Sequence, residues 1–154
     1  MKEIVLLFGE MGGGKTYLGQ KLAKAAGYKF VEGDMFVHLE MRQKVDNFRP
    51  IPTSDIRRLV DTLKYEIPYV MAASESGIVL TQALYNDAHR KELIEYWVSC
   101  GYSVSPFLVR PNFFRHVRQL WGRQKGLRWV LYWLLSKPFF QMPTHHCALM
   151  FNNR

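Results

Sequence analysis

Acidic residues are absent from the last third of this sequence, because no aspartate or glutamate follows Glu95. The first 95 residues hold 13 basic and 13 acidic side chains, so the last 59 residues supply the whole net charge of +8. The basic residues of that part are Arg110, Arg115, Arg118, Arg123, Lys125, Arg128, Lys137 and Arg154. Such a segment attracts nucleotide phosphates, nucleic acid or an anionic membrane, or it forms a solvated basic face.

Cysteine and long apolar runs are also scarce. Cys100 and Cys147 have no metal-binding or redox spacing, which predicts reduced thiols in the core of a cytoplasmic protein. The longest apolar run near the end covers only 129–135, which is too short to cross a bilayer. The apolar start lacks the small-residue cleavage site of a signal peptide, so we expect a core strand there. Without repeats or linkers, the sequence predicts one domain over residues 1–154.

One glycine-rich stretch fits the pattern G-x-x-x-x-G-K-[ST], the phosphate-binding loop or Walker A motif. Its residues are Gly9, Glu10, Met11, Gly12, Gly13, Gly14, Lys15 and Thr16. The glycines let the backbone curl around a phosphate without a Cβ in the way. Lys15 would reach the β- and γ-phosphates of a nucleoside triphosphate, and the Thr16 hydroxyl would bind Mg²⁺. ATP and Mg²⁺ are therefore the expected ligands.

The elements around this loop alternate between strands and helices. Apolar runs predict strands over residues 4–8, 28–31, 78–81, 103–109 and 147–151. Composition and helical spacing predict helices over 17–26, 35–44, 87–100, 111–121 and 126–136. A further long helix is expected to be capped by Thr53 or Ser54 and to kink or restart at Pro68. This alternation is typical of a parallel sheet covered on both faces, with ligands at the carboxyl ends of its strands.

Two carboxylates form the second signal of chemistry. Glu32 and Asp34 flank a glycine at the end of the second predicted strand, on the same edge of the sheet as the phosphate loop. One of them could hold Mg²⁺ while the other accepts a proton from a substrate hydroxyl. An ordinary acidic turn that caps a helix explains the pair equally well from the residues alone.

Several segments resemble the gluconate kinases, small P-loop kinases that form a wider group with the shikimate kinases. Besides the phosphate loop, the sequence Phe30-Val31-Glu32-Gly33-Asp34 with the nearby His38 is similar to the end of their second strand. Three more stretches are similar to segments of these kinases: PIPTSDIR at 50–57, TQAL with the downstream Arg90 at 81–93, and the lid approach at 118–126. The resemblance covers about residues 3–126.

The resemblance implies an α/β P-loop NTPase fold of three α/β/α layers, with a five-stranded parallel sheet in the order 2-3-1-4-5 and a lid over about 118–140. It implies phosphoryl transfer from ATP to a hydroxyl of a small metabolite, a sugar acid or similar. Asp34 would act on the hydroxyl as base or aligner, Glu32 would stand near Mg²⁺, and Arg123 would contact the transferring phosphate. The remaining implied site residues are His38, Arg57 and Arg90 at the substrate and Asn152 and Asn153 near the adenine.

The sequence also differs from that group, with Glu32 in place of an aspartate and Tyr85 in place of a lysine. Two other functions stay open: a kinase of nucleotides or nucleic-acid ends, and an ATP-binding switch or membrane-associated P-loop protein without turnover. The basic, aromatic segment from Arg115 onward could be a lid, a membrane-binding surface or a stacking platform for bases. His145-His146 lacks further ligands at metal spacing and is expected to be structural. A homodimer is also left open.

Overall fold

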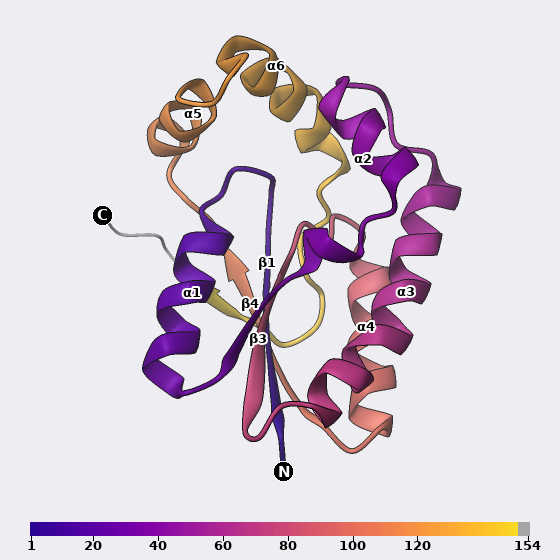
Figure 1. Cartoon of the computed structure of the whole chain (residues 1–154). Coiled ribbons are helices and arrows are strands. Elements are labelled where there is room, and N and C mark those ends of the chain that lie inside the picture. Colours follow the sequence, from indigo (N-terminus) through magenta and orange to yellow (C-terminus); the bar gives the residue numbers. More distant parts are fainter. Residues whose placement is uncertain (151–154) are drawn as a thin grey trace.

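A computed structural model describes residues 1–150 and places five parallel strands in the order β2-β3-β1-β4-β5, which confirms the predicted sheet (Figure 1). The strands are β1 (Glu3–Phe8), β2 (Lys29–Glu32), β3 (Gly77–Gln82), β4 (Ser103–Val109) and β5 (Ala148–Met150). All carboxyl ends therefore lie at one edge of the sheet, where such folds bind their ligands.

Helices cover both faces of this sheet because the central strand is apolar on both sides. Alternate residues of β1 belong to two separate cores: Ile4, Leu6 and Phe8 pack in one, and Val5 and Leu7 pack in the other. The first core is closed by helices α3 (Thr53–Ala72) and α4 (Asp87–Ser99), and the second by α1 (Lys15–Ala26). Such strands, buried on both faces, are typical of parallel sheets.

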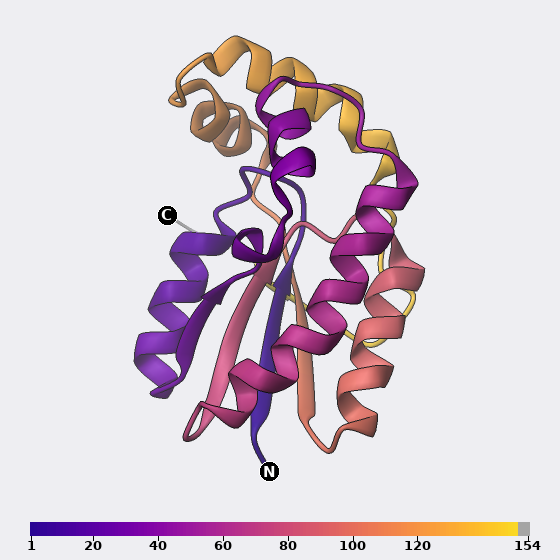
Figure 2. The same cartoon turned by 45° about the vertical axis from the view of Figure 1, so that its right-hand side comes forward.

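The remaining helices lie at the carboxyl edge of the sheet. They are α2 (Leu39–Asp46), α5 (Phe113–Trp121) and α6 (Gly126–Ser136), with the short 3-10 helices η1 (Gly33–Phe36) and η2 (Lys137–Phe139). Figures 1 and 2 show α5 and α6 together at the end of the molecule opposite the N-terminus. Within residues 1–150, no helix is long and apolar enough to cross a membrane.

The helix predicted over 35–44 is divided in the structure. The turn η1 ends at Phe36, Val37 and His38 are extended, and α2 begins only at Leu39. The Val37 N–H donates to the Asp34 carbonyl at 3.2 Å and closes the short turn. This break lets α2 leave the sheet in a new direction, which local helix propensity alone does not reveal.

The side-chain cap expected for α3 is wrong, and of the two outcomes expected at Pro68 the restart does not occur. No side chain caps the helix, and Pro52 precedes its first residue. The helix also does not restart at Pro68, since it continues to Ala72. Ile67 and Met71, on either side of this proline, are fully buried. Their packing against the sheet offsets the lost backbone hydrogen bond.

Proline and cysteine positions account for further differences. Pro106 is accommodated within β4 because β5 begins to pair only at Phe107, so the strand is still an edge on that side. Both cysteines are free, as predicted. Cys100 is nevertheless exposed, because α4 ends at Ser99 and leaves it outside the core, whereas Cys147 is partly buried.

Candidate active site at the phosphate loop

The phosphate loop joins β1 to α1, as predicted. Gly9, Gly12 and Gly14 have φ values of +151°, +70° and +83°, which side-chain-bearing residues rarely adopt. A Cβ on Gly9 would lie 2.4 Å from the Val109 carbonyl oxygen of β4. The glycines therefore satisfy both the curled backbone and the close approach of β4, and they leave the loop in the shape that receives a phosphate.

Lys15 spans the mouth of this loop. Its ammonium donates to the carbonyl oxygens of Gly9 at 3.0 Å and Glu10 at 2.8 Å. Desolvation lowers the pKa of Lys15 to about 8, with the charge of Arg123 acting in the same direction and those of Asp34 and Glu10 opposing it. A half-buried cation held by two carbonyls is well placed to exchange them for phosphate oxygens.

The two residues predicted to hold Mg²⁺ meet each other. The Thr16 hydroxyl donates to the Glu32 carboxylate at 2.9 Å, which joins the start of α1 to the end of β2. A hydroxyl and a carboxylate are the hard oxygen ligands that Mg²⁺ prefers. The residues present thus fit this cation beside the phosphate loop.

Asp34 follows β2 and lies within the electrostatic field of the loop. Desolvation raises its pKa, and Glu32 raises it further, while Lys15, Arg42 and Arg123 lower it. Arg42 of α2 also donates to the Asp34 carbonyl oxygen at 2.8 Å. Sequence reasoning missed Arg42, because α2 begins only after the break that follows η1, and this start brings Arg42 to the main chain of Asp34.

Arg123 reaches the same region from the turn between α5 and α6. It is exposed, and its guanidinium lies 5.4 Å from the centre of the Trp129 ring. Its charge lowers the pKa of both Lys15 and Asp34. Arg123 is thus within electrostatic reach of Lys15 and Asp34, while its direct contact is with Trp129.

Glu10 and Met11, which occupy unspecified positions of the phosphate-loop pattern, connect the loop to α5 and α6. The Trp133 indole N–H donates to the Glu10 carboxylate, and His116 Nε2 lies 2.5 Å from the Met11 carbonyl oxygen. The Met11 N–H donates to the Tyr85 hydroxyl at 3.2 Å. Sequence reasoning missed these contacts because the pattern leaves such positions free. The tyrosine that replaces a lysine of the related kinases thus supports the loop.

His38 and Arg57 have partners elsewhere. His38 Nε2 lies 3.6 Å from the carboxylate of Asp55, which Lys44 contacts at 2.5 Å. Arg57 donates two hydrogen bonds of 2.7 Å to Glu92 and so links α3 to α4. These contacts hold the ends of α2, α3 and α4 together, whereas the resemblance implied substrate contacts for both residues.

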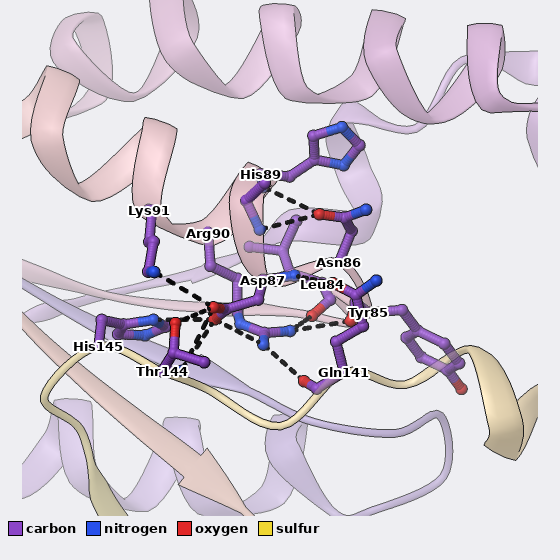
Figure 3. A network of polar contacts seen from close by, with 11 residues as sticks. Leu84, Tyr85, Asn86, Asp87, His89, Arg90, Lys91, Gln141, Thr144 and His145 are labelled. Carbon is purple, nitrogen blue, oxygen red and sulfur yellow. Dashed lines mark hydrogen bonds and ion pairs between the residues drawn. The ribbon is translucent and has the colours of Figure 1, made fainter.

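Arg90, also implied at the substrate, lies inside the fold (Figure 3). It is fully buried and donates to the carbonyl oxygens of Leu84, Tyr85 and Gln141 at 2.5, 3.0 and 2.6 Å. A fourth bond of 3.0 Å reaches the Asp87 carboxylate. With these donors committed, Arg90 joins α4 to the segment before β5, and the expected substrate contact is replaced by a structural one.

Asp87 carries the other half of this network (Figure 3). It accepts hydrogen bonds from the Thr144 hydroxyl at 2.5 Å and from His145 Nδ1 at 3.1 Å. Desolvation opposes ionisation, but the hydrogen bonds from Thr144 and Arg90 hold the pKa of Asp87 well below its usual range. His145 is thus part of a structural network. Asn152 and Asn153, predicted near the adenine, lie outside the described residues.

The comparisons with curated sequences point to small-molecule kinases. The chain is 29% identical over 84 residues to shikimate kinase 2 of Yersinia enterocolitica, which covers 53% of the chain and 48% of that protein. It is 30% identical over 91 residues to a protein named probable gluconokinase from Xenopus tropicalis, with 59% and 47% covered. The chain spans about half the length of these relatives. No family model matches it.

Solved structures agree in fold. A gluconokinase from Sinorhizobium meliloti superposes with a TM-score of 0.71 over 97% of this chain and 81% of that one, at 18% identity. A sugar kinase from Janibacter gives 0.76 over 98% and 84%, at 15% identity. The APS kinase of Mycobacterium tuberculosis gives 0.64 over 99% and 90%, at 15% identity. The predicted resemblance is therefore confirmed: in fold and in its sequence relatives, the chain is similar to the P-loop small-molecule kinases that include gluconokinases and shikimate kinases.

Proposed function

We propose that this protein transfers the γ-phosphate of ATP, with Mg²⁺, to a hydroxyl of a small metabolite such as a sugar acid. The observation that carries the proposal is the hydrogen bond from the Thr16 hydroxyl to Glu32, which joins the phosphate loop with Lys15 to the end of β2, two residues before Asp34. Relatives named gluconokinase, shikimate kinase and APS kinase support the same class of reaction. A cytoplasmic location belongs to the same proposal.

Each residue would have a distinct task in this reaction. Lys15 and the loop N–H groups would hold the phosphates, and Asp34 would orient the acceptor hydroxyl and accept its proton. Thr16 and Glu32 would hold Mg²⁺, which when bound neutralises charge on the phosphates. Arg123 would stabilise the charge that develops on the transferring group. Positioning and electrostatics, rather than covalent chemistry, would supply the rate enhancement.

Arg42 suggests the chemical class of the acceptor. It is exposed, and it is anchored to the backbone of Asp34 by a single 2.8 Å hydrogen bond from Nη2. A guanidinium beside the proposed base suits a carboxylate or another anion on the substrate, because its planar donors match such groups. Relatives named for gluconate and shikimate fit an acidic, hydroxylated acceptor.

The experiment is a transfer assay with ATP labelled in its γ-phosphate. Sugar acids, cyclic hydroxy acids, nucleosides and oligonucleotides with a free 5′-hydroxyl are each offered as acceptor, with and without a chelator of Mg²⁺. We expect label in a hydroxy acid, and none when Mg²⁺ is removed. Label in the oligonucleotides would favour the nucleic-acid-end kinase. ATP binding without transfer to any acceptor class would favour the ATP-binding switch. Either of these two results would overturn the proposal.

A further inference from the structure

Large exposed apolar side chains are concentrated in one part of the sequence. Ten of them lie between residues 113 and 149, at the end of the chain that has no acidic residue. Phe114, Leu135 and Phe139 leave 84%, 73% and 74% of their surface exposed. Exposed apolar groups that cluster in this way mark an interaction site more often than scattered ones do.

Helix α6 has two different apolar faces. Val130 and Trp133 are buried and pack with Met11 of the phosphate loop. Leu127, Leu131 and Leu135 recur every four residues, which places them in one stripe on the other side of the helix, and each is exposed. Figures 1 and 2 show α6 at the outer end of the molecule. The inner face thus belongs to the active-site end, and the outer stripe faces solvent.

Exposed cations lie on the same two helices as these apolar side chains. Arg118 lies on α5 and Arg128 is in the first turn of α6, one residue after Leu127, and both are exposed. The Lys137 ammonium lies instead over the Trp133 and Phe113 rings, at 5.2 and 5.8 Å. No acidic residue of the described chain beyond Glu95 offsets these cations. The exposed residues of α5, α6 and η2 with Arg118 and Arg128 are together called the basic apolar surface below; the apolar ones are Phe114, Trp121, Leu127, Leu131, Leu134, Leu135 and Phe139.

The composition of the basic apolar surface favours one of three candidate partners: a second copy of the chain, nucleic acid or a lipid bilayer. A second copy of the chain would bring two uniformly basic faces together, which like-charge repulsion opposes. Nucleic acid would satisfy the cations but offers no partner for a stripe of aliphatic leucines. An anionic lipid bilayer satisfies both, because leucine and aromatic side chains enter the acyl boundary while Lys and Arg meet the headgroups.

We propose that the basic apolar surface binds the surface of an anionic lipid bilayer. The leucine stripe of α6 lies at the boundary between headgroups and acyl chains, and Arg118 and Arg128 contact the anionic headgroups. Because the inner face of α6 contacts the phosphate loop, the bound protein keeps its active-site edge close to the membrane. This inference does not depend on phosphoryl transfer.

The test is flotation of the full chain with lipid vesicles. One preparation is phosphatidylcholine alone, and the other is an equal mixture of phosphatidylcholine and phosphatidylserine. We expect the chain to float with the mixed vesicles, to float poorly with the neutral ones, and to dissociate as salt is raised. Replacing one cation, Arg118→Gln or Arg128→Gln, should weaken binding about fivefold, the value of one basic residue near such a surface.

The apolar contribution is tested separately. The double variant Leu131→Gln/Leu135→Gln should abolish flotation. If this variant does not fold, Phe139→Gln serves in its place and should remove most of the flotation. The matched control is Tyr69→Gln/Val98→Gln, which removes exposed apolar side chains of α3 and α4 and should float like the parent. Equal binding to neutral vesicles, or binding that survives loss of the leucines, would overturn the proposal. Two other results would also overturn it: a dimer in ultracentrifugation that depends on the leucines, and binding of an oligonucleotide that the leucine and arginine variants lose.

Discussion

Two arginines, Arg123 and Arg90, show how different environments give the same side chain different tasks. Arg123 is exposed at the turn between α5 and α6, and its charge acts on Lys15 and Asp34. Arg90 is fully buried and donates four hydrogen bonds to the chain itself. An arginine whose two terminal nitrogens are bonded to the chain stabilises the fold, whereas an exposed one whose charge acts on the phosphate-loop residues can act on a ligand.

The same distinction separates the carboxylates. Desolvation is the largest influence on Asp34 and raises its pKa, and among residues 1–150 no hydrogen bond to its carboxylate counters this. Asp87 accepts hydrogen bonds from Thr144, Arg90 and His145, and its pKa is lowered. We therefore assign chemistry to the phosphate-loop edge and stability to the Asp87–Arg90 network. The predictions below test this division, beginning with the largest effect.

Replacing Lys15 should have the largest effect on turnover. We expect Lys15→Ala to abolish turnover and to weaken ATP binding more than ADP binding, because the ammonium should face the terminal phosphates. ADP formation gives the rate, and calorimetry gives the two affinities. Circular dichroism checks that the loop variant is folded. Turnover at the parental rate would remove the phosphate-loop edge from the reaction.

Replacing Arg123 should slow the chemical step without unfolding the protein. If it acts as arginine fingers do, Arg123→Gln lowers kcat by roughly 10³-fold or more. KM should change less, because the interaction forms mainly in the transition state. Steady-state kinetics separates the two constants. Arg128→Gln, a neighbouring exposed arginine, is the matched control, and an equal loss in both variants would contradict a specific role.

Replacing Arg90 should have the opposite profile. Arg90→Met leaves the Asp87 carboxylate without its buried partner, which should cost about 3–5 kcal/mol of unfolding free energy. The rate per folded molecule should stay close to that of the parent. Urea unfolding followed by tryptophan fluorescence measures the first quantity, and the active fraction corrects the second. A variant of parental stability with poor substrate affinity would return Arg90 to the substrate site.

The pH dependence should reflect the two perturbed groups. Lys15, with a pKa of about 8, must be protonated to attract phosphate, so kcat/KM for ATP should fall about tenfold per pH unit above that value. On the acid side of the pH profile, activity should be lost at a pH above the ordinary range of a carboxyl group. The reason is that Asp34 must be ionised to act as a base and its pKa is raised. ATP binding near pH 8 should also take up protons, which calorimetry in two buffers detects. A flat alkaline profile would contradict this role of Lys15.

The sequence predicts some of this molecule better than other parts, for physical reasons. The phosphate loop is predictable because the glycines, Lys15 and Thr16 serve a local geometry that a short pattern specifies. The strand order came from the resemblance and is confirmed. The fate of Arg90 was not predictable, since its partners include Gln141, 51 residues away, and only the tertiary fold brings the two together.

The attachment of α5 and α6 was missed for a related reason. Glu10 and Met11 occupy positions that the loop pattern leaves open, and their partners Trp133 and His116 lie more than 100 residues later. Composition marked that segment only as basic and aromatic. It could not divide the segment into an inner face on the loop and an outer face in solvent, because that division follows from packing.

The central claim is that the carboxylate of Asp34 acts on the acceptor rather than on ATP. The most direct measurement is single-turnover phosphoryl transfer by Asp34→Asn, with ATP affinity determined by calorimetry on the same sample. Glu75→Gln, which changes an exposed carboxylate before β3, is the matched control. We predict that Asp34→Asn binds ATP nearly as the parent does while transfer to the acceptor collapses. Transfer at the parental rate would show that Asp34 is only a turn residue and would contradict the assignment of the acceptor site.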